Sequence, residues 1–332
     1  MKIIKSNKNQ LLKSIREIIE NSRNILVKTI NDTIIKSYFE IGRLIVEGEQ
    51  KGKKRAEYSE ETINYLSNKL SEEFGQGFSE RNLRNMRSLY LNYKNNQIWQ
   101  TVSAKLSWSH FLVLMRINNP DERKFYEIES SKENWSVREL KRQMDSSLYE
   151  RLSLSKNKSQ VKQLSKKGQI ISKPEDAIKD PTVLEFLGLE ERPYYSESDL
   201  ESALISKLGN FLLELGKGFT FEARQKRISF NEKNFYIDLV FYHRILKCFV
   251  LIDLKIGELK HQDIGQMQMY VNYYDREIKT ISDNKTIGLI LCKDKDDMII
   301  NYTLPENNKQ IFASKYQLYL PSKKELRNYL KS

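Results

Sequence analysis

The first half of the chain has apolar residues at spacings of three and four, which is the pattern of amphipathic helices. Two such sets are Leu11, Leu12, Ile15, Ile18, Ile19 and Ile25, Leu26, Ile30, Ile34. No strand-like alternation interrupts this periodicity before about residue 150. We therefore predict an all-helical region over residues 1–150.

The pattern weakens between residues 151 and 174, where Ser, Lys, Asn and Gln predominate. This composition is typical of an exposed linker or a mobile basic arm. We place a domain boundary there, so that residues 175–332 form the second domain.

Residues 175–332 mix helical and strand-like patterns. The segment Ser198 to Gly216 predicts a helix that opens with the capping-box pattern Ser198-x-x-Glu201 and ends at Gly216. Apolar strand-like runs follow at about 219–230, 234–242, 247–255, 286–292 and 312–320, with a helix at about 262–279 and a closing helix from Ser322. This order predicts a mixed α/β core.

Within the helical half, a glycine turn at residues 75–77 joins two helical segments, 58–74 and 79–93. A helix-turn-helix needs this arrangement. The second segment presents Arg81, Arg84 and Asn85 opposite its apolar side, and such side chains reach phosphates and base edges in DNA. A helical bundle with a charged outer face fits equally well. A third possibility is that these helices bind a protein partner, although the basic charge of residues 151–174 favours nucleic acid.

Composition describes a globular protein. Of 332 residues, 39% are hydrophobic and 30% charged, no apolar run approaches 18 residues, and the amino terminus is polar. We expect a cytoplasmic protein without a membrane segment. Cys248 and Cys292 lie in apolar runs without a neighbouring ligand residue, so we expect core thiols rather than a disulfide or a zinc site.

The net charge of +12 points to a polyanionic partner, although a solvated basic surface explains it too. The excess is uneven along the chain. Residues 1–150 carry 26 Lys and Arg against 20 Asp and Glu, residues 151–174 carry 7 against 0, and residues 175–332 carry 23 against 24. This distribution suits a carboxylate-rich site to which basic segments deliver a nucleic acid.

Candidate chemistry lies in two adjacent strand-like runs, where Asp238, Asp253 and Lys255 interrupt apolar sequence. Buried charges cost several kcal/mol unless they pair or bind a metal. A short turn makes the two runs a hairpin, so the carboxylates can lie side by side and bind a hard cation, Mg²⁺ or Mn²⁺. Lys255 would then hold the attacking water or stabilise negative charge. The alternative is a solvated edge strand or a simple ion pair.

Polar residues nearby can extend this site. Gln266 and Tyr270 share one face of the following helix and Gln268 flanks them, so they can position a water molecule or a phosphate. Glu222, Arg224 and Gln225, on the strand before Asp238, can touch the site or a DNA backbone. All of these residues could instead be ordinary surface residues.

The motif Asp238, Asp253-x-Lys255 and the run Gly265-Gln-Met-Gln-Met-Tyr-Val-Asn-Tyr-Tyr-Asp275 resemble the PD-(D/E)xK nuclease superfamily and its YhcG-like branch. The resemblance implies a restriction-endonuclease-like core and an amino-terminal domain for DNA binding or assembly. It implies metal ligation by Glu201, Asp238 and Asp253, with Glu201 as the acid of the first helix, although a capping role explains Glu201 as well. Ile237 replaces the proline of the superfamily name.

We therefore expect a Mg²⁺-dependent DNA endonuclease, with Mn²⁺ as a substitute, in restriction, defence, recombination or DNA repair. The alternative is a non-catalytic protein that binds or assembles on nucleic acid and has kept a nuclease fold. Cutting two strands with one site per chain would call for a homodimer or a higher homo-oligomer.

Overall fold

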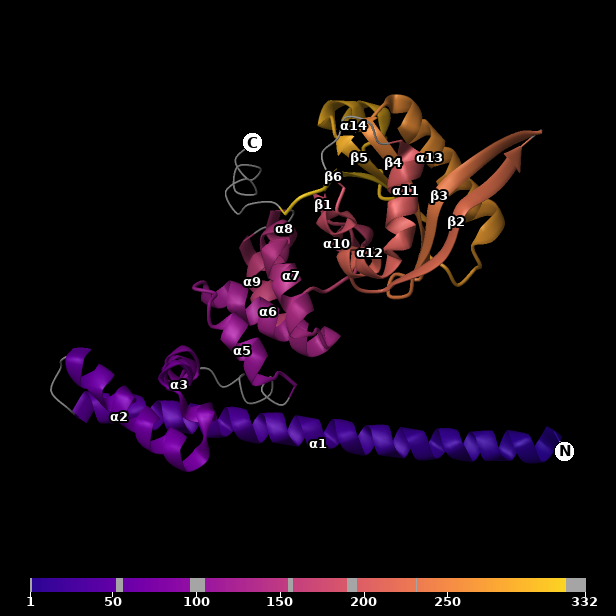
Figure 1. The fold of residues 1–332 in the computed structure, drawn as a ribbon. Helices are drawn as coiled ribbons and strands as arrows, with labels where there is room; N and C mark the ends of the chain where they lie inside the picture. The colour runs from indigo at the N-terminus through magenta and orange to yellow at the C-terminus, as the bar shows by residue number, and fades with distance from the viewer. Residues whose placement is uncertain are drawn as a thin grey trace. The chain divides into compact units, whose positions relative to one another are not determined.

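The computed structural model describes residues 2–51, 56–95, 105–154, 158–189, 196–230 and 232–320. Two compact units make up the chain (Figure 1). The first comprises Met1–Arg142 and Lys162–Gly168, and the second comprises Gln143–Val161 and Gln169–Ser332.

The described residues of the first unit are helical and include no strand, as predicted. Its elements are α1 (Lys2–Lys51), α2 (Ala56–Phe74), the 3-10 turn η1 (Gln76–Phe78), α3 (Glu80–Tyr93), α5 (Trp108–Leu114) and α6 (Pro120–Glu133), with parts of α7 (Val137–Asp145) and α9 (Lys158–Lys167). None of the described helices is both long enough and apolar enough to cross a membrane.

The carboxyl-terminal half of α1 packs on α2 and α3 through a small core. This core contains Ile45, Ile63, Leu83 and Met86. Helices α1 and α3 approach so closely at Gly42 that a Cβ atom there would lie 2.1 Å from the carbonyl oxygen of Met86. Only glycine therefore fits at this crossing.

The second unit is a mixed sheet between helices. It comprises α8 (Leu148–Leu154), α10 (Pro174–Ala177), β1 (Thr182–Val183), η2 (Glu185–Leu187), α11 (Glu197–Ser206), α12 (Leu208–Leu215), β2 (Phe219–Phe230), β3 (Lys233–His243), β4 (Cys248–Glu258), α13 (His261–Tyr273), the π-helical turn η3 (Tyr274–Ile278), β5 (Ile287–Asp294), α14 (Asp297–Thr303) and β6 (Ile311–Gln317). The strand order is β1-β6-β5-β4-β3-β2. Strands β2, β3 and β4 pair antiparallel, whereas β4, β5, β6 and β1 pair parallel.

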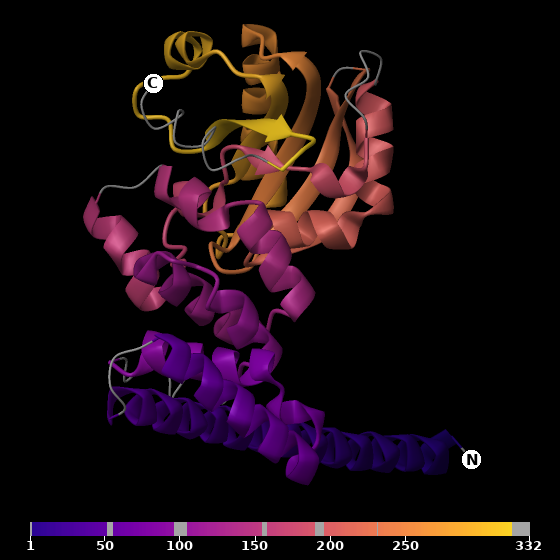
Figure 2. The same cartoon turned by 60° about the vertical axis from the view of Figure 1, so that its left-hand side comes forward.

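Two hydrophobic layers enclose the sheet, with α11 and α13 on opposite faces (Figures 1 and 2). Strand β4 shows the alternation that this requires. Val250, Ile252 and Leu254 join the layer under α11 and α12, and Leu251 joins the layer under α13. The predicted mixed α/β core is therefore confirmed.

Two details differ from the sequence-based expectations, and a third expectation is untested. The helix predicted from Ser198 begins at Glu197 instead, because Ser196 is its N-cap and pairs with Asp199 in the capping box. It also breaks at Lys207, where φ is −120°, into α11 and α12, and ends at Gly216 as predicted. The closing helix from Ser322 lies outside the described residues.

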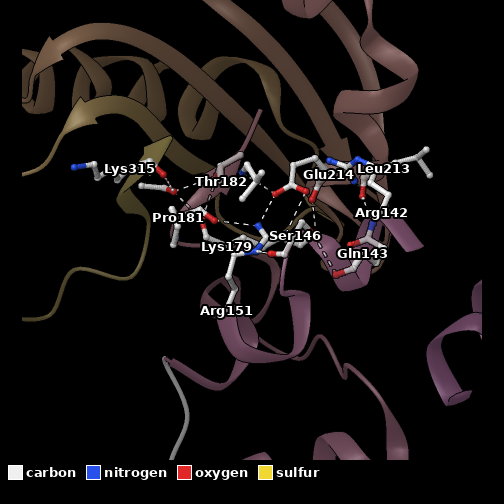
Figure 3. A network of polar contacts seen from close by, with 12 residues as sticks. Arg142, Gln143, Ser146, Arg151, Lys179, Pro181, Thr182, Leu213, Glu214 and Lys315 are labelled. Carbon is white, nitrogen blue, oxygen red and sulfur yellow. Dashed lines mark hydrogen bonds and ion pairs between the residues drawn. The ribbon is translucent and has the colours of Figure 1, made fainter. Parts of the chain in front are cut away.

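The expectation of an exposed linker over 151–174 is wrong for much of that segment. Helices α8, α9 and α10 occupy parts of it, and Arg151 is buried. The Arg151 guanidinium lies 2.6 Å from Glu214 Oε1, and both side chains have no exposed surface (Figure 3). A polar composition predicted exposure, but a buried carboxylate on α12 gives this arginine a partner inside the second unit.

Candidate functional site

The strands β3 and β4 bring the predicted acids together where their ladder ends. Their pairing extends to Leu239 opposite Ile252, one residue short of Asp238 and Asp253. Beyond that point, Asp238 Oδ2 accepts a hydrogen bond of 2.8 Å from the backbone N–H of Leu254. The Asp238 carboxylate thus takes the place of a backbone acceptor and is fixed against β4.

Asp253 is buried, with 3% of its surface exposed. Its Oδ2 lies 3.0 Å from Nζ of Lys255, an ion contact without the geometry of a hydrogen bond. Burial raises the pKa of Asp253 to about 7, and the charges of Asp238 and Glu197 add to this rise while Lys255 opposes it. Near neutral pH this carboxylate therefore gains from an additional positive charge.

Lys255 lies between two acids. Its Nζ is 3.0 Å from Asp253 Oδ2 and 3.5 Å from Oε2 of Glu197, which begins α11. Burial alone would lower the pKa of Lys255, but the charges of Asp253 and Glu197 outweigh burial and hold it above its usual value. The ammonium group is therefore a permanent positive charge at this edge of the sheet.

Glu201 reaches the same site from α11. It is largely buried, and its Oε2 accepts a hydrogen bond of 2.6 Å from Nε2 of Gln225. The same nitrogen donates to Asp238 Oδ1 at 3.0 Å. Burial raises the pKa of Glu201, and the nearby charge of Asp238 raises it further. The hydrogen bond from Gln225 and the charge of the exposed Arg224 oppose this rise. Ser196 and Asp199 cap the helix, so the capping explanation of Glu201 is wrong.

Of the polar residues predicted on α13, Tyr270 lies near enough to the acids to feel their charge. Tyr270 is fully buried and donates a 2.9 Å hydrogen bond to the carbonyl of Tyr236, while its hydroxyl accepts from Gln266. Burial raises the pKa of Tyr270, and Asp253 and Asp238 contribute to that rise. Gln268 instead donates to Asn272 on the same helix.

The acid pair fits a hard cation that keeps part of its own coordination shell. Across the described part of the chain, no three His, Cys, Asp or Glu side chains are grouped to hold a metal ion. Mg²⁺, however, is often bound by one or two carboxylates, with water and substrate phosphate completing its shell. Asp253 Oδ2 is buried and contacts the Lys255 ammonium at 3.0 Å, so a cation bound beside Asp238 would share this oxygen with Lys255.

The predicted DNA-binding residues of the first unit lie on α3. Arg81 and Arg84 are exposed and Asn85 is partly buried. Arg84 pairs with Glu80 at 3.1 Å and lies 3.9 Å from Glu60. A surface hollow of about 600 Å³ beside it is lined by Glu60, Glu61, Asn64, Tyr65, Asn68, Lys69, Glu80 and Arg84. Acidic neighbours thus partly neutralise this face, and its role in DNA binding stays a prediction.

The sequence of this chain is similar to a known protein family over most of its length. Residues 175–331 match the YhcG PDDEXK nuclease domain, and residues 14–151 match the DUF1016 N-terminal domain. The Escherichia coli (strain K12) protein named "Putative nuclease YhcG" is 38% identical, and the alignment covers 97% of this chain and 93% of that protein. The chain belongs to the YhcG family of PDDEXK nucleases. The expected family and fold class are therefore confirmed.

Two solved structures align with part of this chain. A repair endonuclease from Pyrococcus abyssi is 14% identical, with a TM-score of 0.26, over 40% of this chain and 50% of that one. The structure of an EndoMS-dsDNA2 complex is 13% identical, with a TM-score of 0.26, over 41% of this chain and 50% of that one. The chain thus spans about half the length of these two structures.

Sequence reasoning left the role of Gln225 open and missed Glu197. Gln225 bonds both Glu201 and Asp238, and Glu197 contacts Lys255. Gln225 lies next to Arg224 in a polar stretch of β2, and Glu197 follows the N-cap of α11. Neither has a periodicity that separates it from surface residues, because only the folded sheet brings them to the acids.

Proposed function

We propose that this chain is a nuclease that hydrolyses DNA phosphodiester bonds with a divalent cation at Asp238 and Asp253. The observation that carries the proposal is the buried Asp253 carboxylate, whose pKa is raised to about 7 by burial and which lies 3.0 Å from the Lys255 ammonium. Such an arrangement is costly for stability and suits a site that gains a cation and a phosphate.

Each residue has a distinct part in the proposed reaction. Asp238 and Asp253 would hold Mg²⁺, with Mn²⁺ as a substitute, and Glu201 would act as a further carboxylate of the site. When bound, the cation polarises a phosphate oxygen and lowers the pKa of a coordinated water. Lys255 stays protonated, so it donates hydrogen bonds to the phosphate and stabilises the negative charge that develops there.

The hydroxyl of Tyr270 is already engaged by a strand carbonyl, so its proposed part is to hold Gln266. Gln266 is partly exposed and can contact water or phosphate from α13. We propose that Arg224 and Gln268 contact the nucleic-acid backbone near the site, because phosphate contacts position a nucleic acid without reading its sequence.

DNA is the proposed substrate because the chain carries a net charge of +12 and a nuclease site. Endonucleolytic cutting of DNA serves restriction, defence, recombination and repair, and these are the processes that we propose. The amino-terminal unit would bind DNA or assemble with a partner through α3.

The test is a cleavage assay of the full chain on linear, circular and branched DNA and on RNA, with Mg²⁺, with Mn²⁺ and with EDTA. Asp253→Ala and Lys255→Ala should abolish cation-dependent cutting. Asp283→Ala is the matched control, because Asp283 binds Tyr242 and Thr280 outside the site. If wild type binds DNA but cuts no substrate, the non-catalytic alternative holds. If both site variants cut as wild type does, the assigned site is wrong.

A further inference from the structure

Gln225 has an unusual backbone conformation in the middle of β2. Its φ angle is 45°, in the left-handed region that residues other than glycine rarely adopt. The pairs Arg224–Leu239 and Lys226–Ile237 flank it, so Gln225 lies across from Asp238. Strained residues of this kind persist where the surrounding structure requires them, often at functional sites.

The Gln225 amide makes two contacts that join separate elements. Nε2 donates to Glu201 Oε2 on α11 at 2.6 Å and to Asp238 Oδ1 on β3 at 3.0 Å. Asp238 Oδ2 is held by the N–H of Leu254. The two carboxylates would repel each other without a donor between them, and a neutral amide lets them approach without the charge of a cation.

We propose that Gln225 is a positioning residue, which holds Glu201 against Asp238 so that the acid of α11 becomes part of the cation site. This inference rests on the proposed function. The Gln225 side chain contacts the two acids and not the substrate, and its positive φ angle directs the side chain toward them. Partners of metal ligands typically change metal affinity by about 10–100-fold when they are removed.

The decisive variant is Gln225→Gly in the full chain. Glycine adopts positive φ without strain, so this change removes the amide and should leave stability unchanged or higher. Lys226→Gly is the control for introducing a glycine into the same exposed stretch of β2, because the φ angle of Lys226 is not positive. Mn²⁺ affinity is measured by electron paramagnetic resonance of free Mn²⁺, and the Mg²⁺ concentration for half-maximal cleavage is measured beside it.

For Gln225→Gly we expect about 10-fold weaker Mn²⁺ binding and a matching rise in the half-saturating Mg²⁺ concentration, with an unchanged melting temperature. Lys226→Gly should bind Mn²⁺ as wild type does. Wild-type Mn²⁺ affinity in Gln225→Gly would overturn the positioning role. Absence of cleavage and of Mn²⁺ binding by wild type would instead overturn the proposed function on which the inference rests.

A second, independent observation concerns the amino-terminal part of α1. Nine apolar side chains there are between 36% and 65% exposed, and they are Leu12, Ile15, Ile18, Ile19, Ile25, Leu26, Val27, Ile30 and Ile34. At roughly 100 Å² each they expose on the order of 900 Å² of apolar surface, more than the largest patch of a typical monomer. One side of a standard protein interface buries about 800 Å². We call these nine residues the α1 stripe.

The α1 stripe is symmetric in its central part. Ile19 and Leu26 are equally far from the Ser22–Arg23 midpoint, as are Ile18 and Val27, and Ile15 and Ile30. A two-fold interface presents the same surface from both copies, so residues equally far from its centre meet each other. Antiparallel pairing centred on residues 22 and 23 therefore matches these six apolar residues with one another, while Ile25 meets Glu20 and Leu12 meets Thr33.

We propose that the α1 stripe pairs with the same stripe of a second copy of this chain, antiparallel and centred at Ser22–Arg23. The surface area, the apolar character and the symmetry agree with this partner. The pairing concerns assembly and does not depend on the proposed function.

Disulfide crosslinking of the full chain tests both the partner and its direction. Ser22→Cys places a thiol next to its own copy at the centre of the antiparallel pair, whereas Thr33→Cys meets residue 12 instead. We expect rapid crosslinking of Ser22→Cys and little crosslinking of Thr33→Cys. Light scattering should give the mass of a dimer for wild type and the mass of a monomer for Ile19→Asp. Equal crosslinking of both cysteine variants would indicate a parallel pair and overturn the direction. A wild-type monomer at micromolar concentration would overturn the proposal.

Discussion

The ion pair between Arg151 and Glu214 is expected to be essential for the stability of the second unit. Arg151 donates to Glu214 Oε1 at 2.6 Å, to the carbonyl of Pro181 at 3.0 Å and to the carbonyl of Ser146 at 2.9 Å. Glu214 Oε1 also accepts from the N–H of Val183 at 2.9 Å. These contacts tie α8 to α12, the helix that follows the Glu201 helix, and to β1 (Figure 3).

Arg151→Met removes the cation that pairs with Glu214, which stays buried. Breaking a buried pair in this way costs about 3–5 kcal/mol of unfolding free energy. Replacing both partners by apolar residues is much less costly, but the N–H of Val183 then loses its acceptor, at about 1–3 kcal/mol. Arg151→Met with Glu214→Met should therefore be more stable than Arg151→Met alone.

Urea unfolding, monitored by circular dichroism, measures the unfolding free energies of Arg151→Met and of the double variant. Trp108 and Trp135 lie in the described part of the first unit, so their fluorescence reports the unfolding of that unit as an internal control. A loss below about 1 kcal/mol for Arg151→Met would refute the reasoning. So would a double variant no more stable than the single one.

Three further predictions concern buried polar groups. Burial raises the pKa of Glu127 from 4.5 to about 7. The folded protein thus keeps this proton to higher pH than the unfolded chain, and unfolding free energy should fall by up to about 3 kcal/mol as pH rises from 4.5 to 7. Glu127→Gln should remove that fall, as measured by urea unfolding at pH 5 and pH 8; an unchanged slope would exclude this cause. Burial also raises the pKa of Cys248 to about 12 and of Cys292 to about 11, so neither thiol should react with Ellman's reagent at pH 8 until the protein unfolds, and fast reaction in the folded state would contradict their burial. Tyr270→Phe leaves the Tyr236 carbonyl without its donor and should lower unfolding free energy by about 1–3 kcal/mol, and a wild-type value would show that this bond is dispensable.

Local sequence pattern predicted the elements that build the site. Strands β3 and β4 follow from apolar runs, and a charge inside such a run is visible without a structure. Asp238, Asp253 and Lys255 could therefore be named in advance. In the first unit, apolar residues recur at spacings of three and four along most of the sequence. This pattern predicted the helices, because the apolar face of a helix is set by residues close together in sequence.

The parts that could not be predicted depend on contacts between elements distant in sequence. Arg151 lies in a Lys-rich stretch, and only its distance to Glu214 shows that it is buried. Gln225 becomes part of the site because a bulge between Phe221 and Ala223 and its own positive φ alter the face that β2 presents. Composition carries neither signal.

The start of α11 shows a subtler limit. Ser196 and Ser198 both precede acids at spacings that suit a cap, and local pattern favoured Ser198 with Glu201. The chain uses Ser196 with Asp199, which frees Glu201 to turn toward Gln225. A cap two residues earlier thus changes Glu201 from a helix-end residue into a candidate ligand.

The central claim is that Asp238 and Asp253 act as one cation site for phosphodiester cleavage. The most direct measurement is the single-turnover rate of Mg²⁺-dependent DNA cleavage by Asp238→Asn, Asp253→Asn and the double variant. We predict that each single variant loses about 100-fold or more and that the double variant is no slower than the worse single one, because residues that act as a unit are not additive. Rates within a few-fold of wild type for either single variant would contradict the claim.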